Sequence, residues 1–374
     1  MNICFLTSGH DPFDDRIFYH MARSLAHKKY HIGIISSTTF KNEVIDDINL
    51  NCFDAEGLSK KEKVRQFTER LTEFRPEVII CSEPLPLYAA HSYSKGQNLK
   101  ARTIYDITEW YPSKKNLCHY NPLIRWFFFI KLLAFNIWVS GVADSFIFGE
   151  WYKSRPYRFL FPFKPFTFIS YYPDLIFTNY TNPEIRDNKI KLSYSGKISN
   201  DKGFGNFIKV IDLLSDRRKN MKIEVKIIGW HDEYCEKNAI DFNLPDKQNV
   251  SFTFYDRQPF IEYPDLIKDT DIFIDLRDND LENNHCLPIK LFYYAAMTRP
   301  VIFSDLKSIR KEIDINEFVL LVNPADTNEI VKIILMYIDN SDLYIKHSLA
   351  ARRKVEQKYN WNLLESQFID FVTS

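Results

Sequence analysis

The chain has 374 residues, which is enough for two or three domains with sizeable cores. Lys and Arg together number 49, as do Asp and Glu, so the formal net charge is zero. That balance argues against a main role in wrapping nucleic acid, which needs excess positive charge. Only 10 residues are glycine, so few places let the backbone approach a phosphate closely.

The six cysteines are spread over the chain, and no two form a C-x-x-C pair. This spacing predicts reduced thiols in a cytoplasmic protein, not a disulfide framework or a zinc site. Residues 1–7 contain neither a basic region nor a small-residue cleavage site, so we expect a first strand there and not a signal peptide.

In the first half, short apolar runs alternate with helical patterns. The runs are apolar on both faces, which is typical of buried parallel strands. We expect strands at 3–6, 32–35, 78–81, 103–105 and 145–148, and helices at 15–27, 60–74, 85–94 and 122–139.

The turn after the first strand holds Gly9, His10, three aspartates and an arginine. One glycine does not make the G-x-G-x-x-G of a dinucleotide site, which disfavours a nicotinamide or flavin enzyme. Asp14 and Asp15 fit the cap and first turn of the following helix. For His10, ligand contact and a role in loop structure remain equally open.

Carboxylates and aromatic rings follow the strand at 103–105, namely Asp106, Glu109, Trp110 and Tyr111. Carboxylates accept from sugar hydroxyls, and rings stack on sugar faces, so this segment is a candidate sugar site. The alternative is an ordinary capped loop.

Residues 121–139 combine several Trp and Phe with Arg125 and Lys131. Such a helix could lie in a bilayer interface and serve a lipid-linked acceptor. The alternative is a buried helix that covers the first sheet.

The proline- and aromatic-rich stretch 155–183 is predicted to be extended and to separate two domains. A second alternating series follows, which predicts βαβ units and a second parallel sheet. Its strands are expected at 191–195, 222–228, 251–254, 272–275, 301–303 and 319–322; its helices are expected at 204–214, 263–268, 288–297 and 327–340, followed by 342–357 and 361–372.

The first turn of the second series, 195–205, contains three of the ten glycines and two lysines, Lys197 and Lys202. Glycines such as Gly196 and Gly203 let backbone N–H groups approach an anion, and lysines and a helix N-terminus attract a diphosphate. We therefore predict a phosphate site here, although it is not a Walker A loop. The alternative is an exposed lysine loop.

A polar run follows the strand at 272–275, and Pro288 is predicted to be the first residue of the next helix. Asp278 and Asp280 match the D-x-D of metal-dependent glycosyltransferases. A solvated acidic loop is the competing interpretation.

Four segments together resemble retaining glycosyltransferases of family 4 (glycosyl transferases group 1), which have the GT-B fold. These are the histidine–aspartate–arginine turn at 10–16, the D-x-x-E-x-Y-P segment at 106–112, the Y-S-G-K-I-S-x-x-K-G segment at 194–203, and L-P-x-K-L-F-x-Y-x-A ending in P-V-I at 287–302. The resemblance covers nearly the whole chain. It implies two Rossmann-like domains facing across a cleft: an acceptor domain at 1–180, joined by a C-terminal helix at 359–374 that crosses back, and a nucleotide-sugar domain at 181–358.

By this resemblance the chain would be a cytoplasmic, bacterial-type enzyme of polysaccharide assembly, at the inner face of the membrane if the apolar helix docks there. It would move a sugar from a nucleotide-diphosphate sugar to a glycan or lipid-linked acceptor, with retention and without metal, cofactor or nucleic acid. The expected catalytic residues are His10, Lys197, Lys202 and Glu109; the donor-binding residues are Gly9, Gly196, Gly203, Leu287, Pro288, Ile289, Lys290 and Tyr293; the acceptor-binding residues are Asp106, Thr108, Trp110 and Tyr111.

The sequence departs from the family pattern where acids usually bind the donor ribose, at Tyr293 and His285, and where histidine often stands, at Thr108. Two alternatives therefore stay open. One is a GT-B-like nucleotide-sugar-binding or regulatory protein with weakened catalysis. The other is a metal-dependent transferase that uses Asp278 and Asp280.

Overall fold

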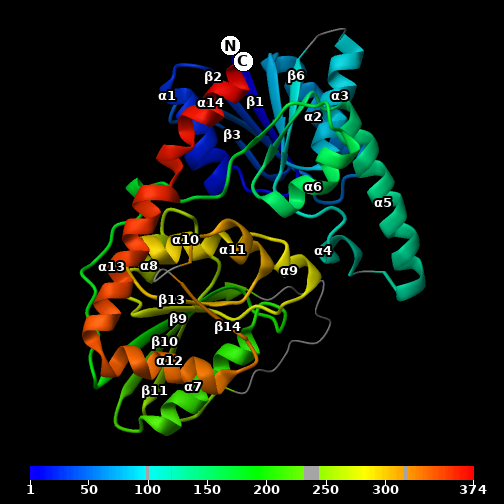
Figure 1. The fold of residues 1–374 in the computed structure, drawn as a ribbon. Helices are drawn as coiled ribbons and strands as arrows, with labels where there is room; N and C mark the ends of the chain where they lie inside the picture. Colours follow the sequence, from blue (N-terminus) through cyan, green and yellow to red (C-terminus); the bar gives the residue numbers. More distant parts are fainter. Residues whose placement is uncertain (98–100, 119, 231–243, 316–318) are drawn as a thin grey trace. The chain divides into compact units, whose positions relative to one another are not determined.

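The chain divides into two compact units. The computed structural model describes residues 1–97, 101–118, 120–230, 244–315 and 319–374. Unit 1 comprises Met1–Tyr171 and Leu364–Ser374, and unit 2 comprises Tyr172–Leu363. Each unit is an α/β domain built on its own sheet, which confirms the predicted fold class (Figure 1).

Unit 1 contains an eight-stranded sheet in the order β3-β4-β2-β1-β5-β6-β7-β8. All neighbouring strands are parallel except β3 and β4, which form an antiparallel pair at one edge. The strands are β1 (Asn2–Thr7), β2 (His31–Ser36), β3 (Thr38–Ile45), β4 (Ile48–Asp54), β5 (Val78–Cys81), β6 (Arg102–Ile107), β7 (Ser145–Phe148) and β8 (Phe166–Phe168).

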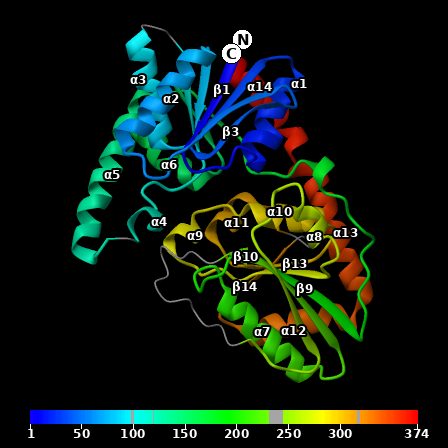
Figure 2. The same ribbon diagram turned by 180° about the vertical axis from the view of Figure 1, so that it is seen from behind.

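The helices of unit 1 cover both faces of this sheet (Figure 2). Leu6 and Cys81 share a core with side chains of α2, α3, α5 and α6 on one face. The alternate residues Ile3 and Phe5 point to the other face, where η1, α1 and α14 contact one another. The helices are η1 (Asp15–Ala22), α1 (Arg23–His27), α2 (Lys60–Phe74), α3 (Pro84–Gln97), α4 (Lys114–Leu117), α5 (Pro122–Val142), α6 (Trp151–Leu160) and α14 (Glu365–Thr373).

Helix α14 is fixed to unit 1 by Arg102 at the start of β6. The Arg102 guanidinium donates to the carbonyls of Phe371 (3.0 Å), Val372 (3.2 Å) and Ser374 (2.8 Å). A cation at the C-terminal end of a helix satisfies carbonyls that have no partner within the helix. The C-terminal helix α14 therefore belongs to unit 1, which also contains the N-terminus.

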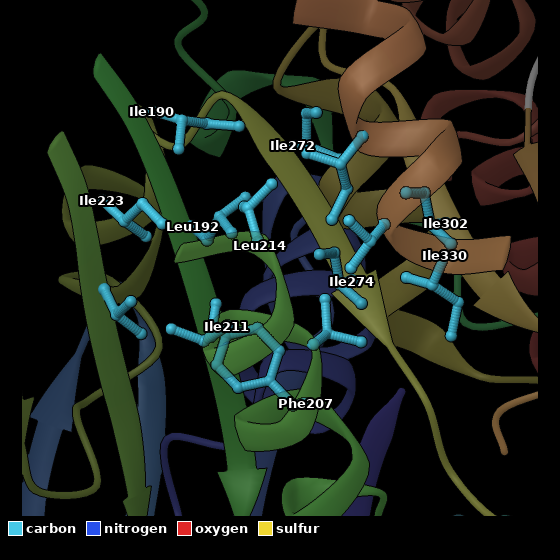
Figure 3. Packing of buried hydrophobic residues seen from close by; sticks show 14 of the residues in the cluster. Ile190, Leu192, Phe207, Ile211, Leu214, Ile223, Ile272, Ile274, Ile302 and Ile330 are labelled. Carbon is cyan, nitrogen blue, oxygen red and sulfur yellow. The ribbon is translucent and has the colours of Figure 1, made fainter. Parts of the chain in front are cut away.

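Unit 2 contains a six-stranded, wholly parallel sheet in the order β11-β10-β9-β12-β13-β14. Its strands are β9 (Lys189–Lys197), β10 (Lys222–Trp230), β11 (Val250–Tyr255), β12 (Ile272–Asp275), β13 (Val301–Ser304) and β14 (Val319–Val322). Helices α7 (Phe204–Arg217) and α12 (Thr327–Asp339) pack on one face, where Phe207, Ile211 and Ile330 meet the isoleucines of β9, β10 and β12 (Figure 3).

The other face of the second sheet is covered by α10 (Ile289–Ala296), α11 (Lys307–Glu312) and α13 (Ser341–Lys358). Shorter helices complete the unit: η2 (Leu175–Phe177), α8 (Tyr263–Ile267), α9 (Leu281–Asn284) and η3 (Trp361–Leu363).

Two local predictions need correction. The stretch from 155 to 183 is not extended throughout, because α6 runs through Pro156 as far as Leu160, although the strand β8 follows. Burial of Lys153, Ser154 and Tyr157 on the inner side of α6 outweighs the helix-breaking tendency of the proline. Pro288 is the N-cap of α10 and not its first helical residue.

The cysteine prediction holds for four residues and fails at one. Cys4, Cys52, Cys81 and Cys286 are free thiols, whereas Cys118 is disulfide-bonded. Cys235 lies outside the described residues.

One helix of the described chain, at Ile124–Val142 in α5, is long and apolar enough to cross a membrane by length and composition. Only 17% of its window is buried, so it is not a core helix covered on all sides, in contrast to one of the two interpretations of its sequence.

Candidate functional site

The turn between β9 and α7 holds the predicted lysines of unit 2 in a defined loop. The Tyr194 hydroxyl donates to the carbonyls of Lys197 (2.6 Å) and Lys202 (3.3 Å). Gly203 adopts φ = +78° and caps α7 without a side chain. The turn thus carries Lys197 and Lys202 shortly before the N-terminus of a 14-residue helix, an arrangement typical of a phosphate site.

Asn283 connects this loop to the loop after β12. Its amide nitrogen donates to the carbonyls of Asp201 (3.2 Å) and Asp278 (3.0 Å), and its Oδ1 accepts from Lys202 Nζ (2.9 Å). Asn283 is 3% exposed, so this cross-link lies in a buried setting. Lys202 is thus held at the edge of the site while its side chain stays 37% exposed.

Lys290, in the first turn of α10, lies against Gly196. Its Nζ donates to the carbonyl of Ser195. A Cβ atom on Gly196, which has φ = +119°, would collide with that ammonium. Burial lowers the pKa of Lys290 to about 8, helped by the positive charges of Arg277 and Lys202 and opposed by Asp275.

Arg277 adds a guanidinium group to the two lysines, Lys202 and Lys290. Its Nε and Nη2 donate to the two Asp275 oxygens at 2.8 and 2.6 Å. Burial raises the pKa of Asp275, but Arg277 and Lys290 outweigh it and leave that pKa below its usual value. Asp275 therefore stays ionised and pairs with Arg277, while Asp201 Oδ2 lies 3.7 Å from Lys202 Nζ.

The remaining predicted donor residues lie around α10. Leu287, Pro288 and Tyr293 are buried, and Ile289 is half-buried. The Tyr293 ring packs edge-on against Phe260 at 5.8 Å. These apolar surfaces can contact a base or ribose, but they supply no carboxylate for the ribose hydroxyls.

The two aspartates of the D-x-D match have structural roles in the loop. Asp280 caps α9 by accepting from the N–H of Asn283 (2.8 Å), and the N–H of Asp278 donates to the carbonyl of Asp201 (3.0 Å). No group of three or more His, Cys, Asp or Glu suited to a metal ion occurs among the described residues. His285 ends α9, and its Nδ1 lies 2.9 Å from the carbonyl of Leu281.

In unit 1, the first turn wraps around the carboxylate of Glu83, which follows β5. Thr7 Oγ1 and the N–H groups of Ser8 and Gly9 donate to it at 2.9, 2.8 and 3.2 Å. His10 Nε2 lies 3.5 Å from the same carboxylate. The loop thus brings Gly9 and His10 to an acid that the sequence analysis did not single out.

His10 is held as a cation by the acids around it. Its Nδ1 lies 2.9 Å from Asp14 Oδ2, and Asp14 also caps η1 by accepting from two backbone N–H groups. Although burial lowers the pKa of His10, the bond to Asp14 and the charges of Asp14, Glu83 and Glu109 raise it to about 10. At neutral pH this imidazolium is a hydrogen-bond donor and not a base.

Asp106 is engaged inside unit 1. Its two oxygens accept from Arg16 Nε and Nη2, both at 2.8 Å, and each side chain of the pair is 1% exposed. Arg16 also donates to the carbonyl of Ile169 (2.8 Å) and stacks on Tyr171. The geometry assigns Asp106 to positioning the first turn and gives its carboxylate no exposed surface for an acceptor.

The loop after β6 presents the other predicted acceptor residues. Thr108 is buried, and its carbonyl accepts from Lys153, which pairs with Glu150 at 2.7 Å. Glu109 is exposed, and Trp110 and Tyr111 are half-buried. The loop therefore carries an exposed carboxylate and two partly exposed aromatic rings.

Sequence reasoning missed Glu83, Arg277 and Asn283. Glu83 directly follows the strand at 78–81, so its place at the carboxyl end of a strand was a usable signal. Arg277 and Asn283 stand in a run of acids and amides, and nothing in that pattern separates site residues from solvated ones.

Comparisons with known proteins bear on the fold of the chain and on the family of its second unit. Residues 189–340 match the family described as "Glycosyl transferases group 1". No curated protein sequence matches the chain.

Three solved structures illustrate the similarity of fold. Sucrose-phosphate synthase from Thermosynechococcus elongatus is 13% identical, with 99% of this chain and 98% of that chain covered at a TM-score of 0.73. Anabaena HepE in complex with UDP-glucose is 12% identical over 100% and 99% of the two chains, with a TM-score of 0.70. WaaG, a glycosyltransferase involved in lipopolysaccharide biosynthesis, is 14% identical over the whole of both chains, with a TM-score of 0.70.

Identities this low show the fold alone, and the family match concerns residues 189–340. Residues 189–340 are therefore a glycosyl transferases group 1 domain, and the chain as a whole has the GT-B fold of these solved structures.

Proposed function

We propose that the enzyme transfers a sugar from a nucleoside-diphosphate sugar to a glycan or lipid-linked acceptor, with retention and without a metal ion. The observation that carries the proposal is the group of Lys202, Lys290 and Arg277 beside the turn that carries Lys197 and leads into α7. Arg277 pairs with Asp275 and Lys202 with Asp201, and the cations offer charge-assisted hydrogen bonds that suit a diphosphate.

In this mechanism the protein stabilises the leaving group. The bond between the sugar C1 and the diphosphate oxygen breaks while a bond from C1 to the acceptor oxygen forms on the same face. The acceptor proton passes to the departing diphosphate. Lys197, Lys202 and the N-terminus of α7 would stabilise the negative charge that develops there, which is electrostatic catalysis by groups already in place.

Unit 1 would bind the acceptor. His10, held as an imidazolium, would donate to an oxygen of the substrates, and Glu109 would accept from a hydroxyl. Trp110 and Tyr111 would stack on sugar rings, while Thr108 is held beneath them by Lys153. The exposed apolar side of α5 would support peripheral contact with the inner face of a membrane, where a lipid-linked acceptor would be reached from the cytoplasm.

The test is calorimetry with UDP, UDP-glucose and other nucleotide sugars in the presence of a chelator, followed by assays of sugar transfer and donor hydrolysis. We expect Lys202→Met to weaken UDP binding by roughly 10- to 100-fold, as loss of a charged hydrogen bond costs about 1.5–3 kcal/mol. Lys209→Met is the matched control, because Lys209 is an exposed lysine of α7, the helix that follows Lys202.

Each alternative function predicts a different result in these assays. Binding without hydrolysis or transfer would favour a weakened, regulatory protein, for which Tyr293 and His285 in place of acids are the motivating feature. Activity that is lost with the chelator and with Asp278→Asn would favour the metal-dependent transferase. Absence of binding to every nucleoside diphosphate would contradict the proposal itself.

A further inference from the structure

A recess lies in unit 1, between α6 and the segment that leads into β8. Its volume is 750 Å³. Phe166 begins β8, so the recess lies at the amino end of that strand, whereas the candidate active-site loops follow the carboxyl ends. Its ten lining residues comprise five aromatics, two prolines, three cations and no acid.

Two of the cations are held only by aromatic rings. The Arg155 guanidinium lies 5.0 Å from the centre of the Trp151 ring, and that of Arg158 lies 4.8 Å from the centre of Phe166. Both arginines are exposed, and within the described ranges neither has a hydrogen bond or an ion pair. Their guanidinium donors therefore remain available to an anion while the rings fix their positions.

The third cation connects the recess to α5. Lys164 Nζ donates to the carbonyls of Gly141 (2.7 Å) and Ala143, where α5 ends. It also lies 5.6 Å from the ring of Phe161. Lys164 thus adds a cation to the lining, and the acid that interacts with it, Asp144, lies outside the lining.

Large apolar side chains project into solvent beside these cations. Phe159 is 84% exposed and Phe163 is 97% exposed, and Leu160 between them is 45% exposed. Neighbouring side chains exposed to this degree form an apolar patch of the kind that marks an interaction surface. The combination of projecting phenylalanines with unpaired arginines is the pattern of a surface that enters an anionic bilayer interface.

We propose that this recess docks on a bilayer of anionic phospholipid, with Arg155 and Arg158 on lipid phosphates and Phe159 and Phe163 inserted among the acyl chains. The site is separate from the exposed side of α5, although α5 ends beside it. It concerns binding and does not require that sugar transfer occurs.

Vesicle flotation of the full chain tests the proposal. The vesicles are phosphatidylcholine alone, or phosphatidylcholine with about one third phosphatidylglycerol. We expect the double variant Arg155→Gln/Arg158→Gln to partition onto the anionic vesicles about 30-fold more weakly, from about fivefold per charge at a membrane surface. Lys60→Gln/Lys61→Gln removes two exposed charges from α2 of the same unit and should change partitioning little.

A second pair of variants separates lipid from soluble phosphate. Phe159→Ser/Phe163→Ser should weaken vesicle binding about tenfold, since buried apolar area drives insertion. Both side chains are exposed, so the fold is expected to persist, which circular dichroism would check. Trp126→Glu/Phe129→Glu reports the contribution of α5 separately.

The proposal is overturned if neutral and anionic vesicles bind equally, or if the arginine variant partitions like the lysine control. It is also overturned if millimolar inorganic phosphate displaces the protein from vesicles and the phenylalanine variant binds unchanged, because the recess would then serve a soluble anion.

Discussion

The substitution Gly203→Ala tests the phosphate turn most sharply. Gly203 combines a left-handed backbone, φ = +78°, with a close approach to the chain after β12. An added Cβ would collide with the carbonyl group of Leu276 and would lie 2.8 Å from the backbone nitrogen of Arg277. Because these are backbone atoms, α7 or the 276–277 segment has to move.

Two costs add at this position. An alanine in the left-handed region costs about 1–2 kcal/mol. Displacement of packed backbone adds about 1–3 kcal/mol, typical of overpacking, which gives roughly 2–5 kcal/mol in total. Gly57 is the matched control, because its φ is +71° but an added Cβ there meets nothing within 4 Å. Gly57→Ala should therefore cost only the backbone strain, about 1–2 kcal/mol.

Hydrogen exchange of peptides from the Gly203 turn and from the Gly57 turn measures the local loss of stability caused by each substitution. At 1.4 kcal/mol per tenfold, Gly203→Ala should speed exchange in the first turns of α7 by at least about 30-fold. Calorimetry should show UDP binding weakened more than about tenfold in Gly203→Ala and unchanged in Gly57→Ala. If Gly203→Ala binds UDP like the unaltered protein, the assignment of this turn to the diphosphate is refuted.

Two further predictions concern titration. Lys290 has a pKa of about 8 in the free protein, so it should take up a proton when a diphosphate binds above pH 8. The affinity for UDP should therefore fall as the pH rises through 8. Calorimetry in buffers of different ionisation enthalpy would detect the proton uptake, and Lys290→Met should abolish it. For His10, folding raises the pKa from 6.5 to about 10, so its stabilising contribution is complete below pH 6.5 and is lost as the pH rises through 10. The stability difference between the unaltered protein and His10→Gln should therefore shrink from pH 6 to pH 10, and NMR titration of Asp14→Asn should show a lower pKa at His10; an unchanged pKa would contradict the role of Asp14.

Much of the fold was predictable because its strands are buried on both faces. Apolar runs such as 78–81 and 145–148 became β5 and β7 with the predicted bounds. Two of the missed elements have a physical explanation. Strand β3 contains only exposed and half-buried side chains, and α6 depends on tertiary burial of Tyr157 around a proline. Neither feature produces a local apolar signal.

The site was predictable where the chemistry of the side chains and the conformation required of the backbone indicate the same turn. Glycines and lysines in a glycine-poor chain pointed to the 195–205 turn, and the structure brings Lys290 to Gly196 there. Contacts between segments that are distant in the sequence produce no such local pattern. The sequence predicts that Asp106 binds the acceptor. In the structure Arg16, 90 residues away, donates hydrogen bonds to both of its carboxylate oxygens.

The attachment of Leu364–Ser374 to unit 1 has a consequence for the order in which the chain matures. Unit 2 is one uninterrupted stretch, so all of its strands and helices have been synthesised before unit 1 is complete. The surface that receives Phe368, Ile369 and Val372 stays uncovered on the nascent chain until the final residues leave the ribosome. Unit 1 thus begins before unit 2 and is completed after it, and a chain that ended at Leu363 would contain all of unit 2 beside a unit 1 that lacks α14.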